Sequence, residues 1–290
     1  GIAGMNVISP TWFFLSDDDG NFVSIGSTDY VNKAHSRGLE VWALLDNFTY
    51  DVNTKEILSY TSKRAKLIEG LVNEALALGV DGINVDLEQV SSEAGEDYVE
   101  FLRELSISCR ANNLVLSVDN YVPKNYNAHY DWKEQGKVAD YVIIMGYDEH
   151  YGGSQEPGSV ASIGYVEEGI STMVQSVPPE KVINAVPFYT RIWETSGGEV
   201  KSQAVGMSAV QKFLSDRNIE AVWDEDTCQN YAEVQDGDSF YQVWIEDARS
   251  LEVKMNIMKS YNIGGVAAWK LGYEKGHPEV WDVLSGFANG

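Results

Sequence analysis

The stretch Gly79-Val80-Asp81-Gly82-Ile83-Asn84-Val85-Asp86-Leu87-Glu88 alternates apolar and polar side chains as a β-strand does. Successive strand residues point to opposite faces, so one face is apolar. The other face carries Asn84, Asp86 and Glu88. An exposed edge strand also alternates, but its polar face usually carries scattered Lys and Thr. A strand between two helices is normally covered on both faces, so these three groups should point into a barrel interior or a cleft.

Helical and strand patterns alternate along most of the chain. Residues 55–78 place apolar side chains at helical spacing and stop at Gly79, and residues 93–110 form the next predicted helix. Strands are predicted at 5–14, 39–45, 114–119, 138–147, 181–189 and 264–271. Helices are also predicted at 27–37, 162–175 and 247–261, the last capped by Asp247. Repeated strand and helix without a repeated sequence predicts a parallel α/β barrel or open parallel sheet.

The alternation breaks between residues 190 and 246. This stretch contains a Gly197-Gly198 turn, a short helix near 208–216, and alternating runs that Asp236-Gly237 could join as antiparallel strands. We therefore predict one barrel domain over residues 1–290, with a small α+β subdomain inserted at 190–246.

Composition limits the classes of partner. A chain of 290 residues that is 44% hydrophobic can bury the core of one barrel, and its net charge of -23 disfavours nucleic acid and anionic membrane surfaces. We expect no membrane insertion, since no apolar run reaches about 18 residues. The two cysteines and four scattered histidines predict neither a disulfide framework nor a metal site, and we expect no cofactor. The chain starts at Gly1 without a signal-peptide pattern, so we expect a mature or excised form.

The polar strand resembles the catalytic strand of glycoside hydrolase family 18, the chitinase-like family, whose pattern is Asp-Gly-x-Asp-x-Asp-x-Glu. The matching residues are Asp81, Gly82, Asn84, Asp86 and Glu88. Asn84 departs from the pattern, and this departure is similar to the bacterial enzymes related to spore-cortex and cell-wall N-acetylglucosaminidases. Three more elements follow in family order: Met-x-Tyr-Asp at 145–148, Tyr-x-Arg at 189–191, and Trp269.

The resemblance implies a TIM (β/α)8-type barrel in which the catalytic strand is the fourth of eight. We find about seven core strands, two of them before the catalytic one. The resemblance therefore implies that the first strand lies upstream of Gly1 and is absent here, or that the short segment 22–25 replaces it.

The resemblance also implies roles for the residues that match the motifs. Family enzymes use the 2-acetamido oxygen of the substrate as nucleophile, so the protein supplies one acid. Glu88 would be this general acid and later the base, Asp86 would accept the acetamide N–H, and Tyr147 would donate to the acetamide oxygen. We expect Asn84 to orient Asp86 without changing its charge. The substrate-binding residues would be Asn84, Asp148, Tyr189, Arg191 and Trp269.

Three tryptophans and one glycosylation pattern are weaker candidates for functional residues. Trp12, Trp132 and Trp193 could form neighbouring sugar subsites, with ordinary packing as the alternative. Asn47-Phe48-Thr49 matches the acceptor pattern for N-glycosylation, which is common by chance.

The sequence therefore predicts a retaining hydrolase of β-linked N-acetylglucosamine glycans, either peptidoglycan-type or chitin-like. The alternative is a non-catalytic, lectin-like barrel, although the intact Glu88 disfavours it. A wall glycan as substrate implies a bacterial protein that is extracellular or associated with the cell wall.

Overall fold

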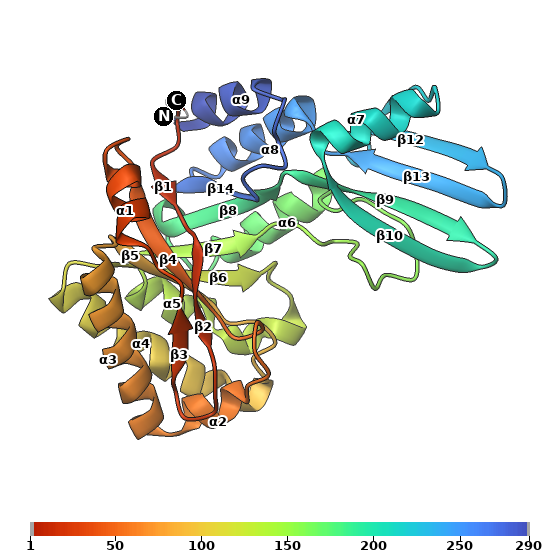
Figure 1. Cartoon of the computed structure of the whole chain (residues 1–290). Helices are drawn as coiled ribbons and strands as arrows, with labels where there is room; N and C mark the ends of the chain where they lie inside the picture. Colours follow the sequence, from red (N-terminus) through yellow and green to blue (C-terminus); the bar gives the residue numbers. More distant parts are fainter. Residues whose placement is uncertain (1–2, 289–290) are drawn as a thin grey trace. The chain divides into compact units, whose positions relative to one another are not determined.

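The computed structural model describes residues 3–288, which fall into two compact units. The first unit comprises the chain up to Ile144 together with Met173–Val182, and the second comprises Met145–Thr172 and the chain from Ile183 onward. The elements of both units carry their labels in Figure 1.

The first unit is built on a sheet with the strand order β3-β2-β4-β5-β6-β7, and β1 also pairs with β4. Strands β2, β4, β5 and β6 pair in parallel. The bounds are β1 Val7–Ile8, β2 Thr11–Leu15, β3 Phe22–Ser24, β4 Glu40–Asp46, β5 Gly82–Asp86, β6 Val115–Tyr121 and β7 Tyr141–Met145. All five residues of β5 are buried, as expected for a strand covered on both faces.

The short segment 22–25 does not replace a barrel strand. Strand β3 pairs antiparallel with β2, with Phe13 opposite Ser24 and Leu15 opposite Phe22. The turn 16–21 is too short for the crossover that a parallel neighbour requires, so the segment forms the second arm of a hairpin. That alternative was wrong.

Helices α1 Thr28–His35, α2 Thr54–Ser59, α3 Thr61–Leu78, α4 Gly95–Ala111 and α5 Trp132–Val138 belong to the same unit. Figure 1 shows α3 and α4 side by side, and these two helices pack together. The predicted helix 55–78 is two helices, because Tyr60 adopts an extended conformation with φ -108° and ψ 119°. Gly79 ends α3 at φ 75°, the left-handed geometry for which glycine is suited, as predicted.

In the second unit, β8 (Val182–Pro187) pairs in parallel with β14 (Gly265–Trp269). The helices are α6 Ile163–Met173, α8 Ala248–Ser260 and α9 Glu279–Ala288. Asp247 caps α8 as predicted, since its carboxylate accepts the N–H of Ser250 at 2.9 Å.

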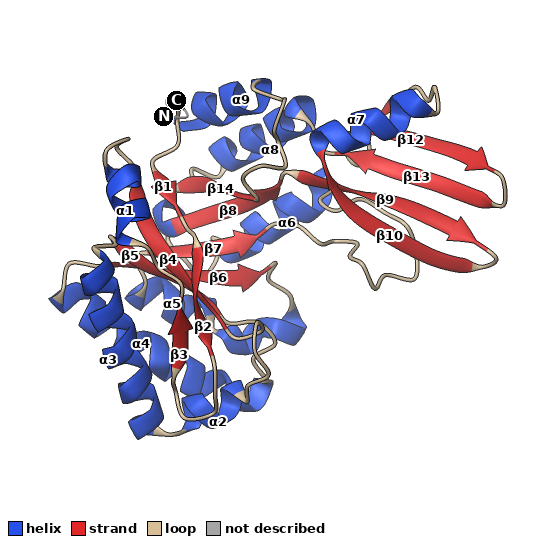
Figure 2. Ribbon diagram, viewed as in Figure 1, coloured by secondary structure: helices blue, strands red, loops and turns tan. Residues whose placement is uncertain are grey.

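A five-stranded antiparallel sheet with the order β10-β9-β13-β12-β11 lies between β8 and β14 in the chain. Its strands are β9 Tyr189–Ser196, β10 Glu199–Gly206, β11 Val222–Asp224, β12 Gln229–Asp236 and β13 Ser239–Ile245. The turns at Gly197-Gly198 and Asp236-Gly237 form as predicted. Helix α7 (Met207–Asp216) packs Val210 against Ala232 and Val243 of this sheet, and Figure 2 shows the long red hairpins.

The architecture is a TIM-barrel-like α/β fold with an α+β insertion before its last strand, as predicted from the sequence. Two parallel strand segments, β1–β2 and β4, precede the polar strand β5, and the antiparallel hairpin strand β3 lies between them in the chain. The strand pairs formed within residues 3–288 do not close a barrel. None of the helices in these residues is long and apolar enough to cross a membrane.

Candidate active site

Three aspartates lie in a row across neighbouring strands of the first unit. Asp46, the last residue of β4, is directly opposite Asp86, the last residue of β5. Val85 is opposite Val118, so continuing the parallel register by one residue places Asp119 of β6 beside Asp86. Neighbouring strands are about 4.8 Å apart, which brings the three carboxyl groups close together. All three are buried, with side chains at most 8% exposed.

Asn84 lies one side-chain layer below this row, and its amide bonds to β6 rather than to Asp86. Its Nδ2 donates to Oδ2 of Asp119 at 2.9 Å, and its Oδ1 accepts from the hydroxyl of Ser117 at 2.7 Å. The reason is the register, because Asn84 is directly opposite Ser117 whereas Asp86 is farther along the same strand. Asn84 is only 3% exposed. The residue that it orients is therefore Asp119.

Asp86 and Asp119 are buried close to other carboxylates, and this environment favours the protonated form of each. Burial raises the pKa of Asp86 to about 9, and the carboxylates of Asp119, Glu88 and Asp46 add to this rise. Burial raises the pKa of Asp119 to about 7, although the hydrogen bond from Asn84 opposes the change. Within the described residues, Oδ1 of Asp86 is buried without a hydrogen-bond partner. The Asp86–Asp119 pair therefore holds a proton near neutral pH and titrates as one coupled system.

Glu88 follows β5 in a short segment that side chains hold in place. The hydroxyl of Tyr121 donates to Oε2 of Glu88 at 3.1 Å and accepts the N–H of Gln89 at 3.1 Å. The hydroxyl of Tyr130 donates to the carbonyl of Leu87 at 3.0 Å. Glu88 is half-buried, so its carboxylate lies where a ligand could reach it.

We expect Asn84→Asp to destabilise the protein by about 1–3 kcal/mol at pH 8. The new carboxylate would replace the amide that now donates to Asp119 at 2.9 Å, so two acceptors would face each other unless one took up a proton. Chemical denaturation at pH 5 and pH 8 would measure this, and the loss should shrink at pH 5. Equal stability of both proteins at pH 8 would contradict the electrostatic role assigned to this amide.

Sequence reasoning missed Asp46 and Asp119. Asp46 directly follows the predicted strand 39–45, and Asp119 is the last residue of the predicted strand 114–119. A carboxylate at the carboxyl end of a strand in this fold class is itself a signal for a site. Whether they lie beside Asp86, however, depends on which strands pair and in which register.

The other predicted residues lie in the second unit, and a hydrogen bond joins two of them. The hydroxyl of Tyr189 donates to Oδ1 of Asp148 at 2.6 Å, and the rings of Tyr147 and Tyr189 meet edge to face at 6.1 Å. Burial raises the pKa of Tyr189 far above its usual range, and the carboxylate of Asp148 adds to the rise, so this hydroxyl remains a proton donor. The Tyr147, Asp148 and Tyr189 side chains therefore form one polar group.

Arg191 and Trp269 are placed differently from that group. Nη1 of Arg191 donates to the hydroxyl of Ser202 on the adjacent strand at 3.0 Å. Trp269 ends β14 with 41% of its surface exposed, which is high for a large aromatic residue, and Nζ of Lys270 lies over its ring at 5.8 Å from the centroid.

Two of the three weaker tryptophan candidates pack in the interior. Trp193 is 1% exposed, and its Nε1 donates to the carbonyl of Gly158 at 2.9 Å. Trp12 is also buried, with its ring edge to face against Tyr30 at 5.3 Å. Packing explains both residues.

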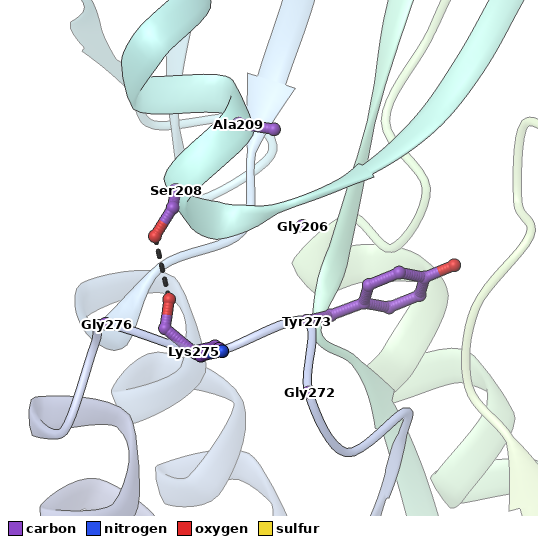
Figure 3. Close-up of a pocket in the computed structure, with 7 residues that line it drawn as sticks. All are labelled: Gly206, Ser208, Ala209, Gly272, Tyr273, Lys275 and Gly276. Carbon is purple, nitrogen blue, oxygen red and sulfur yellow. Dashed lines mark hydrogen bonds between the residues drawn. The ribbon is translucent and has the colours of Figure 1, made fainter.

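A separate cavity of about 510 Å³ lies in the second unit (Figure 3). Its lining residues are Gly206, Ser208, Ala209, Gly272, Tyr273, Lys275 and Gly276. The hydroxyl of Ser208 donates to the carbonyl of Lys275 at 2.7 Å across it. None of the predicted site residues lines this cavity, although the ring of Tyr273 contacts that of Tyr189.

In residues 3–288, no group of three or more His, Cys, Asp or Glu side chains is arranged to hold a metal ion.

Comparisons with known proteins agree with these motifs. The family model of "Glycosyl hydrolases family 18" matches residues 13–274. The chain is 26% identical to the uncharacterized glycosylase YvbX of Bacillus subtilis, over 93% of this chain and 81% of that protein. It is also 26% identical to the cortical fragment-lytic enzyme of Bacillus subtilis, over 94% of this chain and 65% of that enzyme.

The fold has a close counterpart among solved structures. The spore cortex-lytic enzyme SleL of Bacillus cereus superimposes with a TM-score of 0.87 at 26% identity, over 97% of this chain and 67% of that one. The chain spans about half to two thirds of the length of the cortex-lytic relatives that it matches. Since the family match covers nearly the whole chain, the protein belongs to glycosyl hydrolases family 18 and is a glycoside hydrolase.

Proposed function

We propose that the chain is a retaining glycosidase that cleaves β-linked N-acetylglucosamine glycans through the 2-acetamido group of the substrate. The observation that carries the proposal is the arrangement around β5, where one half-buried carboxylate, Glu88, lies next to a buried aspartate pair that holds a proton. A mechanism with a protein nucleophile needs two carboxyl groups from the protein, one protonated as the acid and one ionised as the nucleophile. When the acetamide oxygen is the nucleophile, the protein needs to supply only one acid and the polar groups that hold the acetamide.

The first step would break the glycosidic bond. Glu88 gives its proton to the glycosidic oxygen while the acetamide oxygen attacks C1, so the leaving sugar departs as an alcohol and an oxazolinium-type intermediate forms. Asp86 accepts the acetamide N–H and, when the proton of the pair lies on Asp119, its carboxylate stabilises the developing positive charge. The Glu88 carboxylate then takes a proton from water, and the water oxygen attacks C1 to restore the acetamide. The product keeps the β configuration.

The remaining roles follow from the family resemblance. Tyr147 would donate to the acetamide oxygen, which aligns it for attack. Asp148, Tyr189 and Arg191 would bind sugar hydroxyl groups. Asn84 lies too deep for direct contact with a sugar, so we assign it to the support of Asp119.

We propose a peptidoglycan-type wall glycan as substrate and a bacterial, extracellular or cell-wall location. The support is that several relatives are named cortical fragment-lytic enzymes. A human relative, 24% identical, is named di-N-acetylchitobiase, which makes a chitin-like substrate the second candidate.

One experiment tests the reaction and the substrate together. The purified chain is incubated with peptidoglycan and with N-acetylglucosamine oligomers, products are identified by mass, and the anomer formed first is read by proton NMR. We expect cleavage on the reducing side of N-acetylglucosamine with the β anomer first. An α anomer would exclude the acetamide mechanism, and binding without cleavage would favour the lectin-like alternative.

We expect Trp269→Ala to lower kcat/KM about 10- to 100-fold, mainly through a higher KM. The exposed ring at the end of β14 offers a flat apolar face on which a sugar ring can stack. Trp269→Phe keeps part of that face and should lose less. Initial rates at several oligomer concentrations would show this, and an unchanged KM in the alanine variant would remove Trp269 from the binding site.

A further inference from the structure

We propose that Asn47 is a positioning residue that fixes the backbone of Glu88, an inference that rests on the proposed function. Asn47 directly follows β4, and its amide pairs with both backbone polar groups of Glu88. Nδ2 donates to the Glu88 carbonyl at 2.8 Å, and Oδ1 accepts the Glu88 N–H at 2.8 Å. This pattern imitates the pair of hydrogen bonds that one strand residue would give to a neighbour.

Glu88 needs such a partner because of where the strand stops. Strand β5 ends at Asp86, so Glu88 lies two residues beyond it, and Gln89 adopts a positive φ of 52°. An acid in a loop held only by water would sample many positions. Asn47 supplies, from the neighbouring strand end, the two hydrogen bonds that the ladder no longer provides.

Asn47 is itself anchored, which makes it an effective support. The same Nδ2 also donates to the hydroxyl of Thr54 at 2.8 Å, at the start of α2. The preceding Asp46 accepts both the N–H of Thr49, at 3.2 Å, and its hydroxyl, at 2.7 Å. Both polar side chains of the Asn47-Phe48-Thr49 triplet thus make hydrogen bonds within the protein.

Tyr121 complements this support by acting on the side chain. Its hydroxyl donates to Oε2 of Glu88, whereas Asn47 holds the main chain of the same residue. The carboxamide of asparagine offers a separate donor and acceptor, which match the C=O and the N–H of a single residue. Aspartate keeps the acceptor but loses the donor, and alanine loses both.

Misplacing a catalytic group by about 1 Å can cost about 100-fold in rate. We therefore expect Asn47→Ala to lower kcat about 10- to 100-fold with little change in KM. Asn47→Asp should lie between the alanine variant and the wild type if the retained acceptor still holds the Glu88 N–H. Sugar binding should stay within about 2-fold in both variants, because the groups that contact the sugar are unchanged.

The decisive test combines Asn47→Ala with Glu88→Gln. If Asn47 acts through the acid, the double variant should have the residual kcat of Glu88→Gln alone, because removing the acid already removes the benefit of placing it. The matched control is Asn112→Ala, whose Nδ2 donates to the backbone carbonyl of Ser108 at 2.9 Å at the end of α4. It should keep wild-type kcat despite losing a comparable hydrogen bond.

The outcomes separate this inference from the proposed function. An active wild type, a disabled Glu88→Gln variant and an Asn47→Ala variant with wild-type kcat would overturn the positioning role alone. An equal fractional loss in both backgrounds would also overturn it, because Asn47 would then act independently of Glu88. A wild type that cleaves no N-acetylglucosamine glycan would instead contradict the proposed function.

Discussion

Glu88→Gln is expected to lower kcat on N-acetylglucosamine oligomers about 10³- to 10⁴-fold, the upper range for loss of general acid–base catalysis. The amide has nearly the shape of the carboxylic acid and can still accept the Tyr121 hydroxyl. The two bonds from Asn47 reach the backbone and remain. The variant therefore keeps its geometry but has no proton to give to the leaving oxygen, nor a base to activate water.

Product formation over hours, measured by mass, would quantify this loss, and thermal unfolding would check that the fold is intact. Glu100→Gln is a suitable control, since Glu100 is an exposed carboxylate of α4 that pairs with Arg103 three residues later. It should keep wild-type kcat. Retained activity in Glu88→Gln would mean that the acid is a different residue.

Asp86→Asn is expected to lose activity and gain stability at alkaline pH. Loss of the carboxyl acceptor for the acetamide N–H should lower kcat about 10²- to 10³-fold. The stability change follows from proton binding, because the pKa of Asp86 is about 9 in the folded protein against an ordinary value of 3.8. The folded state thus binds more protons than the unfolded chain above pH 4.

Rising pH therefore destabilises the wild type. The effect begins near pH 4, grows with each pH unit over which the folded Asp86 keeps a proton that the unfolded chain has released, and is complete above about pH 9, where the folded Asp86 is also ionised. Each pKa unit corresponds to about 1.4 kcal/mol. Allowing for relaxation around the pair, we expect Asp86→Asn to be on the order of 3 kcal/mol more stable than wild type at pH 8, and closer to it at pH 5.

Urea unfolding at intervals between pH 5 and pH 9 would measure both curves. Asp140→Asn is the matched control, because the exposed Asp140 only accepts the N–H of Leu116 at 2.8 Å, at the other end of β6. Its pH dependence should parallel that of the wild type. If the free energies of unfolding of Asp86→Asn and wild type changed with pH in parallel, the result would contradict the raised pKa of the buried Asp86.

The chain order of strands and helices could be predicted locally, because periodicity and glycine stops depend on neighbouring residues. The alternation at 82–88 predicted a buried polar strand, Gly79 predicted the end of α3, and Asp247 predicted the start of α8. Tyr60 shows the limit of this reasoning. An apolar pattern that continues through a residue cannot reveal that its backbone is extended.

The motif residues were likewise readable from the sequence. The alternation placed Asn84, Asp86 and Glu88 on one face, and the resemblance to family 18 supplied their proposed roles. The family itself is confirmed by a match over residues 13–274.

Only the tertiary structure decided which groups surround that face. Asp46 and Asp119 lie about 40 and 33 positions from Asp86 in the chain, and Asn47 is as far from Glu88. Parallel strands pair laterally after long crossovers, so their register sets these neighbours and no local pattern records it. The sequence by itself determined the polar face of β5, whereas strand pairing decided that Asp86 lies beside Asp119 and that Asn47 bonds to the backbone of Glu88.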